Sequence, residues 1–258
     1  MSMELRSVLS APVRQAPRAC GIPHACPGTR DHGHVQLEPI TWERLTESLA
    51  DRIAAPPPEE RSPSPTPTPG PWRRVAVDGA PPVRTGAFAD RLAGALRVRG
   101  LPTQVIAADD FLRAASLRFE FGKQDPDAYY DVWYDTGALW REVFDPLEPD
   151  GDGRVLPDLR AASADRPTRS PRVQLPAGGV MLLHGPFLLG RWFPFDLSVH
   201  LALSAGALER QTEEGERWKL PAFARYDEEV GPARTADVFV RAEDPRRPAW
   251  TGSTAQAQ

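Results

Sequence analysis

The sequence contains very little lysine. Of its 31 lysine and arginine residues, only Lys123 and Lys219 are lysines. Any chemistry that requires a lysine side chain must therefore use one of these two positions. The excess of arginine, together with abundant alanine, proline and glycine, is typical of a GC-rich coding sequence.

Cysteine and long apolar runs are also scarce. Two cysteines cannot form a disulfide framework for a chain of 258 residues, which favours a reducing cytoplasm. No run approaches the about 18 apolar residues of a membrane span, and the N-terminal part lacks the apolar core of a signal peptide. The net charge of −4 gives no footprint of nucleic-acid binding. We therefore expect a cytoplasmic protein that binds neither membranes nor nucleic acid.

Proline is abundant, with 29 residues, and it divides the chain. The stretch 54–71 is dense in proline, which fixes φ and removes N–H donors, so we predict an extended linker there rather than a ligand for proline-binding modules. Residues 35–53 before it are predicted to form a helix with Thr41 as N-cap. Apolar side chains recur on one face of that helix: Trp42, Leu45, Leu49 and Ile53. Residues 72–250 are expected to form the folded domain, and residues 251–258 a disordered tail.

The N-terminal segment 1–34 has little apolar periodicity. It holds side chains of the types that bind zinc: Cys20, His24, Cys26, His32 and His34. Their spacing matches no zinc module that we can name, although the ligand types are present. A disordered tail is one alternative, and a native start at Val35 is another.

Short apolar runs alternate with helical patterns along residues 72–250. Strands are predicted at 73–78, 103–108, 180–185, 196–203 and 236–242, and helices at 87–99, 135–144 and 205–211. Such alternation is typical of a parallel sheet that is covered by helices on both faces. We expect a three-layer α/β domain with a five-stranded, mainly parallel sheet, and a ligand site at the carboxyl ends of its strands.

A strand that ends in Asp78-Gly79, followed by a loop and a helix, is the context of a phosphate-binding P-loop. Further segments follow in order: FAD (88–90), ADDF (108–111), DPDAYYD (125–131), VMLLHG-PFLL (180–189), DLSVHL (196–201), RYDEEVGP (225–232) and ADVFV (236–240). In this order and spacing the chain resembles the uridine kinase-like branch of the P-loop nucleoside kinases. The resemblance implies a P-loop kinase fold and transfer of phosphate from ATP, with Mg²⁺, to the 5′-hydroxyl of uridine or cytidine.

The P-loop itself departs from the pattern G-x-x-x-x-G-K-[ST]. Aligned from Gly79, the chain has three replacements: Arg84 for the second glycine, Thr85 for the lysine and Gly86 for the magnesium-binding hydroxyl. Pro81 and Pro82 remove two backbone N–H donors. A loop one residue shorter is the alternative, in which Arg84 replaces the lysine and Thr85 supplies the hydroxyl.

The resemblance also implies an acceptor site. Asp109 matches the aspartate that accepts the proton of the nucleoside hydroxyl, with Asp110 as the alternative. Both residues could instead have a purely structural role and cap the helix or turn that follows the strand. Candidates for a nucleoside pocket are Asp110, Phe111, Asp125, Tyr129 and Tyr130. The aromatic side chains of residues 119–134 could stack on a base, and a packed flap over the sheet is their alternative role. Gln124 aligns with the aspartate that contacts the sugar, so Asp125 is its proposed replacement. His184 stands where many members have an acidic residue, and nitrogen is a poor ligand for Mg²⁺, so we predict no metal site.

A phosphate-closing lid is expected within residues 209–226. Arg210 aligns with its first arginine, and Arg225 is a second candidate. The next basic positions are replaced by Thr212, Glu213 and Glu214, and acidic side chains would repel polyphosphate. Arg217 and Lys219 are expected to be solvated surface charges.

Two functions follow from these observations. The first is a pseudo-kinase, or a protein that binds a nucleoside or nucleotide weakly, because the P-loop lacks the lysine, the hydroxyl and two donors together. It needs no cofactor, and the sequence does not identify a protein partner. The alternative is an active nucleoside kinase that uses ATP and Mg²⁺, with Asp109 as base.

Overall fold

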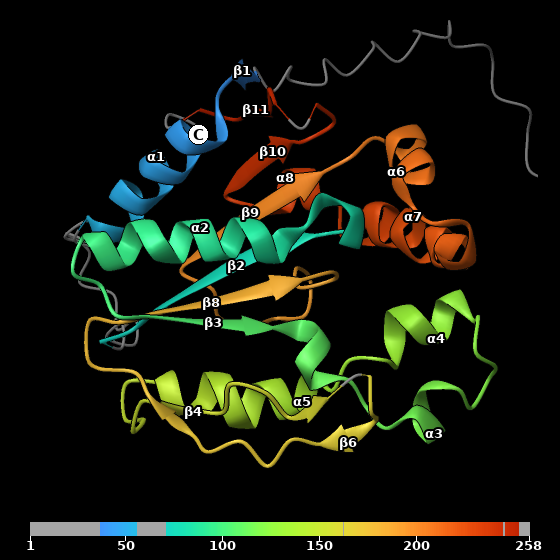
Figure 1. Cartoon of the computed structure of the whole chain (residues 1–258), viewed down its shortest axis with the longest axis horizontal. Coiled ribbons are helices and arrows are strands. Elements are labelled where there is room, and N and C mark those ends of the chain that lie inside the picture. Colours follow the sequence, from blue (N-terminus) through green and yellow to red (C-terminus); the bar gives the residue numbers. More distant parts are fainter. Residues whose placement is uncertain (1–36, 56–70, 162, 245, 253–258) are drawn as a thin grey trace, which may run out of the picture. The chain divides into compact units, whose positions relative to one another are not determined.

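The computed structural model of the chain describes residues 37–55, 71–161, 163–244 and 246–252 (Figure 1). Three predicted segments fall wholly or largely outside these ranges: the N-terminal segment 1–34, the linker 54–71 and the tail 251–258. None of the helices within the described ranges combines the length and the apolar character that a membrane span requires.

The central sheet has seven strands within the described residues, in the order β1-β11-β10-β9-β2-β8-β3. Five of them are parallel: β2 (Arg73–Gly79), β3 (Thr103–Ala107), β8 (Val180–Gly185), β9 (Leu197–Ala202) and β10 (Val238–Arg241). Two antiparallel strands continue the β10 edge: β1 (Glu38–Pro39) and β11 (Ala249–Trp250). The predicted α/β fold with a mainly parallel sheet is confirmed. The sheet is wider than expected because two-residue strands leave no periodic pattern in the sequence.

Helices and turns connect these strands. The α-helices are α1 (Trp42–Ala54), α2 (Thr85–Val98), α3 (Ala115–Arg118), α4 (Pro126–Asp131), α5 (Thr136–Leu139), α6 (Ala205–Gln211), α7 (Leu220–Glu229) and α8 (Pro232–Thr235). Tighter 3-10 helices are η1 (Pro81–Val83), η2 (Ala108–Phe111), η4 (Asp145–Leu147) and η5 (Glu214–Lys219), and a π-helical turn, η3, spans Trp140–Phe144. Two small hairpins pair β4 (Arg154–Val155) with β7 (Val173–Gln174) and β5 (Arg160–Ala161) with β6 (Arg166–Pro167). The predicted helix at 135–144 is therefore divided between α5 and η3.

Alternating side chains of the sheet face two different layers. The helices α1 and α2 cover one face of the sheet (Figure 1). Val75 and Val77 of β2 belong to one buried cluster with Leu45 of α1 and Leu92 of α2. The helix α1 begins directly after the predicted N-cap, because Oγ1 of Thr41 accepts a hydrogen bond from the backbone N–H three residues later, at 3.3 Å. The predicted helical range of 35–53 is too long, since Glu38–Pro39 form the strand β1 instead. This layer fixes the helix that follows the P-loop against the strand that precedes it.

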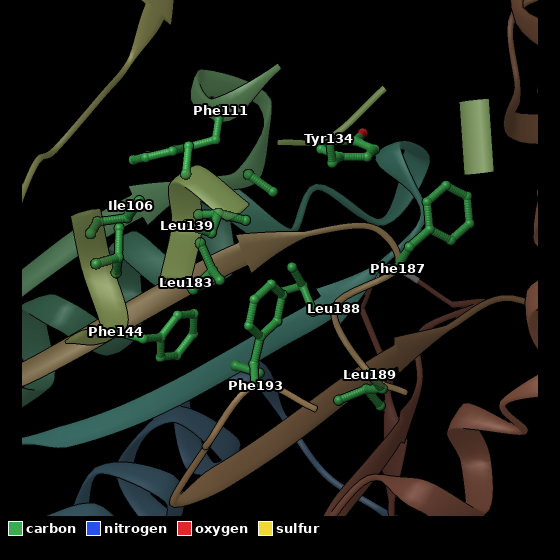
Figure 2. Close-up of a cluster of buried hydrophobic side chains, with 14 of the residues drawn as sticks. Ile106, Phe111, Tyr134, Leu139, Phe144, Leu183, Phe187, Leu188, Leu189 and Phe193 are labelled. Atoms are coloured by element: carbon green, nitrogen blue, oxygen red, sulfur yellow. The ribbon is translucent and has the colours of Figure 1, made fainter. Parts of the chain in front are cut away.

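A layer rich in aromatic rings covers the opposite face of the sheet (Figure 2). Ala76 and Leu183 of the sheet belong to this cluster, together with the fully buried ring of Phe111. The rings of Phe144 and Phe193 stack with their centroids 4.8 Å apart. The sheet is thus covered on both faces, and only its strand ends remain for a ligand site.

Leu92 and Val98 of α2 provide a test of this packing. Leu92 is fully buried and Val98 is 87% exposed. We expect Leu92→Ala to lower the free energy of unfolding by about 2–5 kcal/mol, because it leaves a cavity beneath the helix. Val98→Ala is the matched control and should change it by less than about 0.5 kcal/mol. Urea titration measures both, and equal effects would contradict the arrangement of this layer.

Candidate functional site

Three parallel strands end at the edge of the sheet where the predicted site residues lie. Gly79 ends β2, Asp109 follows β3 within η2, and His184 lies at the end of β8. His184 pairs in register with Val77 on one side and with Ala107 on the other. The sheet therefore brings the P-loop, the candidate base and His184 to one edge.

The P-loop turns tightly after β2. A Cβ atom on Gly79 would lie 2.7 Å from the carbonyl oxygen of Leu201, so the close approach of β9 requires glycine here. The loop then forms η1 and reaches Arg84, which adopts φ 59° and ψ 53°. This left-handed conformation costs a side-chain-bearing residue about 1–2 kcal/mol. Arg84 therefore takes the backbone geometry that the glycine of the pattern would favour, and the structure bears that strain.

The backbone of the same loop is closed by its own hydrogen bonds. Pro81 and Pro82 have no N–H group. The N–H of Val83 donates to Ala80 O and the N–H of Arg84 donates to Pro81 O, both at 3.0 Å. Over residues 81–84, all within the described chain, no backbone N–H is left for a phosphate oxygen. The first turn of α2, which begins at Thr85, retains unpaired amides of its own.

The imidazole of His184 packs against the start of α2. Its Nδ1 lies 3.4 Å from Oγ1 of Thr85, and a Cβ atom on Gly86 would lie 3.0 Å from Cε1 of the ring. Burial lowers the pKa of His184, opposed by the charges of Asp109 and Asp90. A methyl group on residue 86 would press on the imidazole, so glycine leaves room for the ring at this position.

This pairing bears directly on magnesium. In P-loop NTPases a serine or threonine hydroxyl and a carboxylate hold the ion. Gly86 supplies no side-chain oxygen and His184 supplies a nitrogen, whereas Mg²⁺ prefers oxygen ligands. Within the described ranges, no group of three or more histidine, cysteine, aspartate or glutamate side chains is placed to hold a metal ion. Gly86 and His184 therefore do not fit Mg²⁺.

Asp109 is exposed and is held by one aromatic side chain. Its Oδ1 accepts a hydrogen bond from the hydroxyl of Tyr134 at 3.0 Å. Burial raises the pKa of Tyr134 well above its ordinary value, and Tyr129 and Asp109 raise it further. This phenol therefore stays protonated and donates the hydrogen bond. Burial likewise raises the pKa of the adjacent Asp110, with contributions from Asp158 and Asp109. The sequence did not single out Tyr134 for this contact, because only its position in an aromatic stretch was visible.

The other candidates for the nucleoside pocket have packing or capping roles in this structure. Phe111 is fully buried, and Asp125 caps α4 through a 2.7 Å hydrogen bond from the N–H of Ala128 to Oδ1. Tyr129 and Tyr130 are buried in the aromatic layer. The rings within about 6 Å of Tyr129 are those of Trp133, Tyr134, Phe187, Trp218 and Phe223. The two tyrosines thus pack within the aromatic layer, and Asp125 caps a helix.

The two candidate lid arginines lie in different settings. Arg210 is exposed in the last turn of α6. Nη1 of Arg225, on α7, lies 2.8 Å from Asp131 and 3.1 Å from Asp127, and its Nε lies 2.7 Å from Glu229. Hydrogen bonds to Glu229 and Asp131 raise the pKa of Arg225. This guanidinium joins α7 to α4 through Asp127 and Asp131, while Glu229 pairs with it within α7.

Lys219 differs from the sequence prediction of a solvated surface charge. Its Nζ lies 4.9 Å from the ring centroid of Tyr129, 5.5 Å from that of Trp218 and 5.6 Å from that of Trp133. It also pairs with Glu216 one turn earlier. Cation–aromatic attraction and packing of the alkyl stem hold it in place. No pattern in the sequence pointed to this cage, since α4 and η5 are far apart in the chain.

A cavity of about 750 Å³ opens beside the P-loop. Its lining includes residues 81–84, and the cationic groups of Arg84, Arg91 and Lys219. Glu213 and Glu216 line the same space. Cations and carboxylates therefore share this cavity, in contrast to a purely basic phosphate site.

The strand order and the position of the loop define an α/β fold of the P-loop kinase type. Among solved structures, the chain is similar to a possible uridine kinase from Bacillus stearothermophilus, with a TM-score of 0.60, 20% identity, and coverage of 76% of this chain and 97% of that one. The YGR205w protein has a TM-score of 0.51 and 11% identity, with 78% and 93% covered. No family model and no curated protein matches the sequence. At these identities the likeness shows the fold.

Gly86 and Gly94 of α2 allow a matched test of the contact with His184. A Cβ atom on Gly94 would meet nothing within 4 Å. We expect Gly86→Ala to be less stable than Gly94→Ala by about 1–3 kcal/mol, because the new methyl group crowds the imidazole. In a His184→Ala background this difference should disappear. Urea unfolding of the four variants measures it, and a difference that survives without the imidazole would contradict the contact.

Proposed function

We propose that this protein is a pseudo-kinase: it keeps the P-loop kinase fold and binds a nucleoside or nucleotide at most weakly, without transferring phosphate. The observation that carries the proposal is the packing of His184 on Gly86. These two positions correspond to the magnesium-binding carboxylate and hydroxyl of the family that the sequence resembles. With an imidazole and a glycine in their place, the charge neutralisation on which phosphoryl transfer depends is missing.

The loop and the lid support the same proposal. Residues 81–84 offer no backbone N–H to a phosphate, since two are prolines and two are bonded within the loop. Arg225 is paired with three carboxylates. Lys219 is enclosed by aromatic rings and paired with Glu216. Arg225 and Lys219 would each have to leave an existing partner before binding ATP.

An active nucleoside kinase that uses ATP and Mg²⁺ is the second candidate. Asp109 favours it, because this carboxylate is exposed at the carboxyl end of β3, where the base of the family would stand. A carboxylate there could accept the proton of a nucleoside 5′-hydroxyl. The two candidates differ in one measurable property, the magnesium dependence of nucleotide binding and transfer.

Calorimetric titration of the full chain separates them. We expect ATP to bind weakly and with the same affinity in the presence and absence of Mg²⁺, because the residues present do not fit the ion. With uridine and γ-labelled ATP we expect no labelled product above the level of Asp109→Asn, the control that removes the candidate base. Magnesium-dependent binding in the micromolar range, or transfer that Asp109→Asn abolishes, would establish the kinase instead.

Restoring the family pattern gives a complementary test. The variant with Thr85→Lys, Gly86→Ser and His184→Asp regains the lysine, hydroxyl and carboxylate. We expect it to bind ATP about tenfold or more tightly with Mg²⁺ than without it, since a charge-assisted contact contributes about 1.5–3 kcal/mol. The variant with Thr85→Lys alone is the control and should show no dependence on Mg²⁺. Failure of the folded triple variant to respond to Mg²⁺ would show that these positions do not govern binding.

A further inference from the structure

A fully buried carboxylate lies on the aromatic side of the sheet, away from the contacts described above. Asp78, the residue before Gly79, is 0% exposed. Its Oδ1 accepts a hydrogen bond from the N–H of Leu188 at 2.9 Å, and its Oδ2 accepts one from the hydroxyl of Tyr226 at 3.1 Å. The third partner is Nδ1 of His200, 2.6 Å from Oδ2. A buried carboxylate needs such donors to remain ionised.

The sheet register sets this pair. Asp78 of β2 and His200 of β9 are direct partners in the parallel ladder, so their side chains stand side by side on one face. An ionised carboxylate only accepts hydrogen bonds, and this assigns the Nδ1 hydrogen of the imidazole to the side of Asp78. The remaining nitrogen, Nε2, then carries a lone pair when the ring is neutral. An aspartate that orients a histidine in this way is a common device for presenting an acceptor.

Nε2 of His200 has no hydrogen-bond partner among the residues that the structure describes. The residue is 9% exposed, and it lines a cavity of about 670 Å³. Its ring lies nearly parallel to that of Phe239, with centroids 6.1 Å apart and an interplanar angle of 22°. Asp78, Phe239 and the strand thus hold the imidazole in place. His200 lines the cavity, and its Nε2 has no partner among the described residues.

The cavity lies at the carboxyl ends of β9 and β10, beneath α6 and α7. Its apolar lining includes Phe187, Leu203, Leu208, Phe223, Pro232 and Phe239. Such walls favour a flat ring, because burial of apolar area is the main source of binding energy in small-molecule sites.

The charged groups of the cavity disfavour anions. Glu209, Asp227 and Glu243 line it, against a single cation, Arg241. Three carboxylates and one guanidinium leave a negative balance, which repels a phosphate or carboxylate ligand and attracts a cation. In this respect the cavity differs from the one beside the P-loop, where Arg84, Arg91 and Lys219 contribute positive charge.

We propose that this cavity is a second ligand site, which takes a flat ring compound, uncharged or cationic, that donates an N–H or O–H hydrogen bond to Nε2 of His200. Gly79 and Ala80, the first residues of the P-loop, border this cavity. The proposed contacts come from His200 and from the apolar and acidic lining, so the proposal stands whether or not the protein transfers phosphate.

Four compounds with one ring system test the proposal on the full chain by calorimetry. Indole is neutral and has an N–H donor, 1-methylindole lacks the donor, tryptamine is cationic and indole-3-acetate is anionic. We expect tryptamine and indole to bind at least about fivefold more tightly than 1-methylindole, because 1-methylindole would bury Nε2 of His200 without a hydrogen-bond donor. Indole-3-acetate should bind most weakly. Equal affinity of indole-3-acetate and tryptamine, or saturation by none of the four, would overturn the proposal.

Two variants assign the effects to residues. His200→Asn keeps an amide N–H for Asp78 but removes Nε2, so indole and 1-methylindole should bind it equally. Asp227→Asn should weaken tryptamine and leave indole unchanged, whereas Glu228→Gln, an exposed neighbour outside the cavity lining, should alter neither. If His200→Asn still prefers indole over 1-methylindole, the proposed acceptor is wrong.

A measurement on the unaltered protein covers the case in which His200→Asn fails to fold. The ¹⁵N chemical shift of Nε2 of His200 should move when indole is added and should not move with 1-methylindole, because only indole donates to that nitrogen. A shift that is the same with both compounds, or absent with both at saturating concentration, would overturn the proposal.

Discussion

The burial of one carboxylate constrains most of the site edge of this domain. Asp78 has no access to solvent, and an ionised carboxylate in such a place is tolerated only with several donors around it. Its donors are the backbone of Leu188 and the side chains of His200 and Tyr226, which lie 110, 122 and 148 residues later in the chain. The loop after β8, the strand β9 and the helix α7 must all be in place before this charge is satisfied. The end of β2, where the P-loop begins, is therefore fixed by residues from the other half of the chain.

The P-loop departs from the phosphate-binding pattern as a consistent set rather than at isolated positions. The imidazole of His184 lies against Gly86, where a side chain would crowd it, and a glycine at this position offers no hydroxyl to a magnesium ion. The prolines remove two donors, and the short turn that they form bonds the next two amides within the loop. Each replacement is compatible with its neighbours, so reverting a single position would not rebuild the site. Close packing explains this dependence, because a change in the size of one side chain affects the side chains that contact it.

Local patterns in the sequence were sufficient for the framework and insufficient for the site. The apolar runs identified all five parallel strands, and the N-cap at Thr41 located the start of α1, because both signals are carried by adjacent residues. The helix α7 was not predicted, because its buried face has few members. The contacts of Lys219 and the pair formed by Asp78 and His200 depend on strand register and on long-range packing. No spacing within one segment encodes them.

Two cations within residues 209–226 are already paired within the chain. A site built to grip phosphate holds several like charges together, and their mutual repulsion favours the open state until a ligand neutralises them. Here Arg225 already has Asp127, Asp131 and Glu229 as partners, and Lys219 has Glu216 and the faces of three aromatic rings. An arriving polyphosphate would have to displace these partners and face Glu213 as well. Carboxylates from α4, η5 and α7 are thus the counter-charges that the fold itself supplies to these two cations.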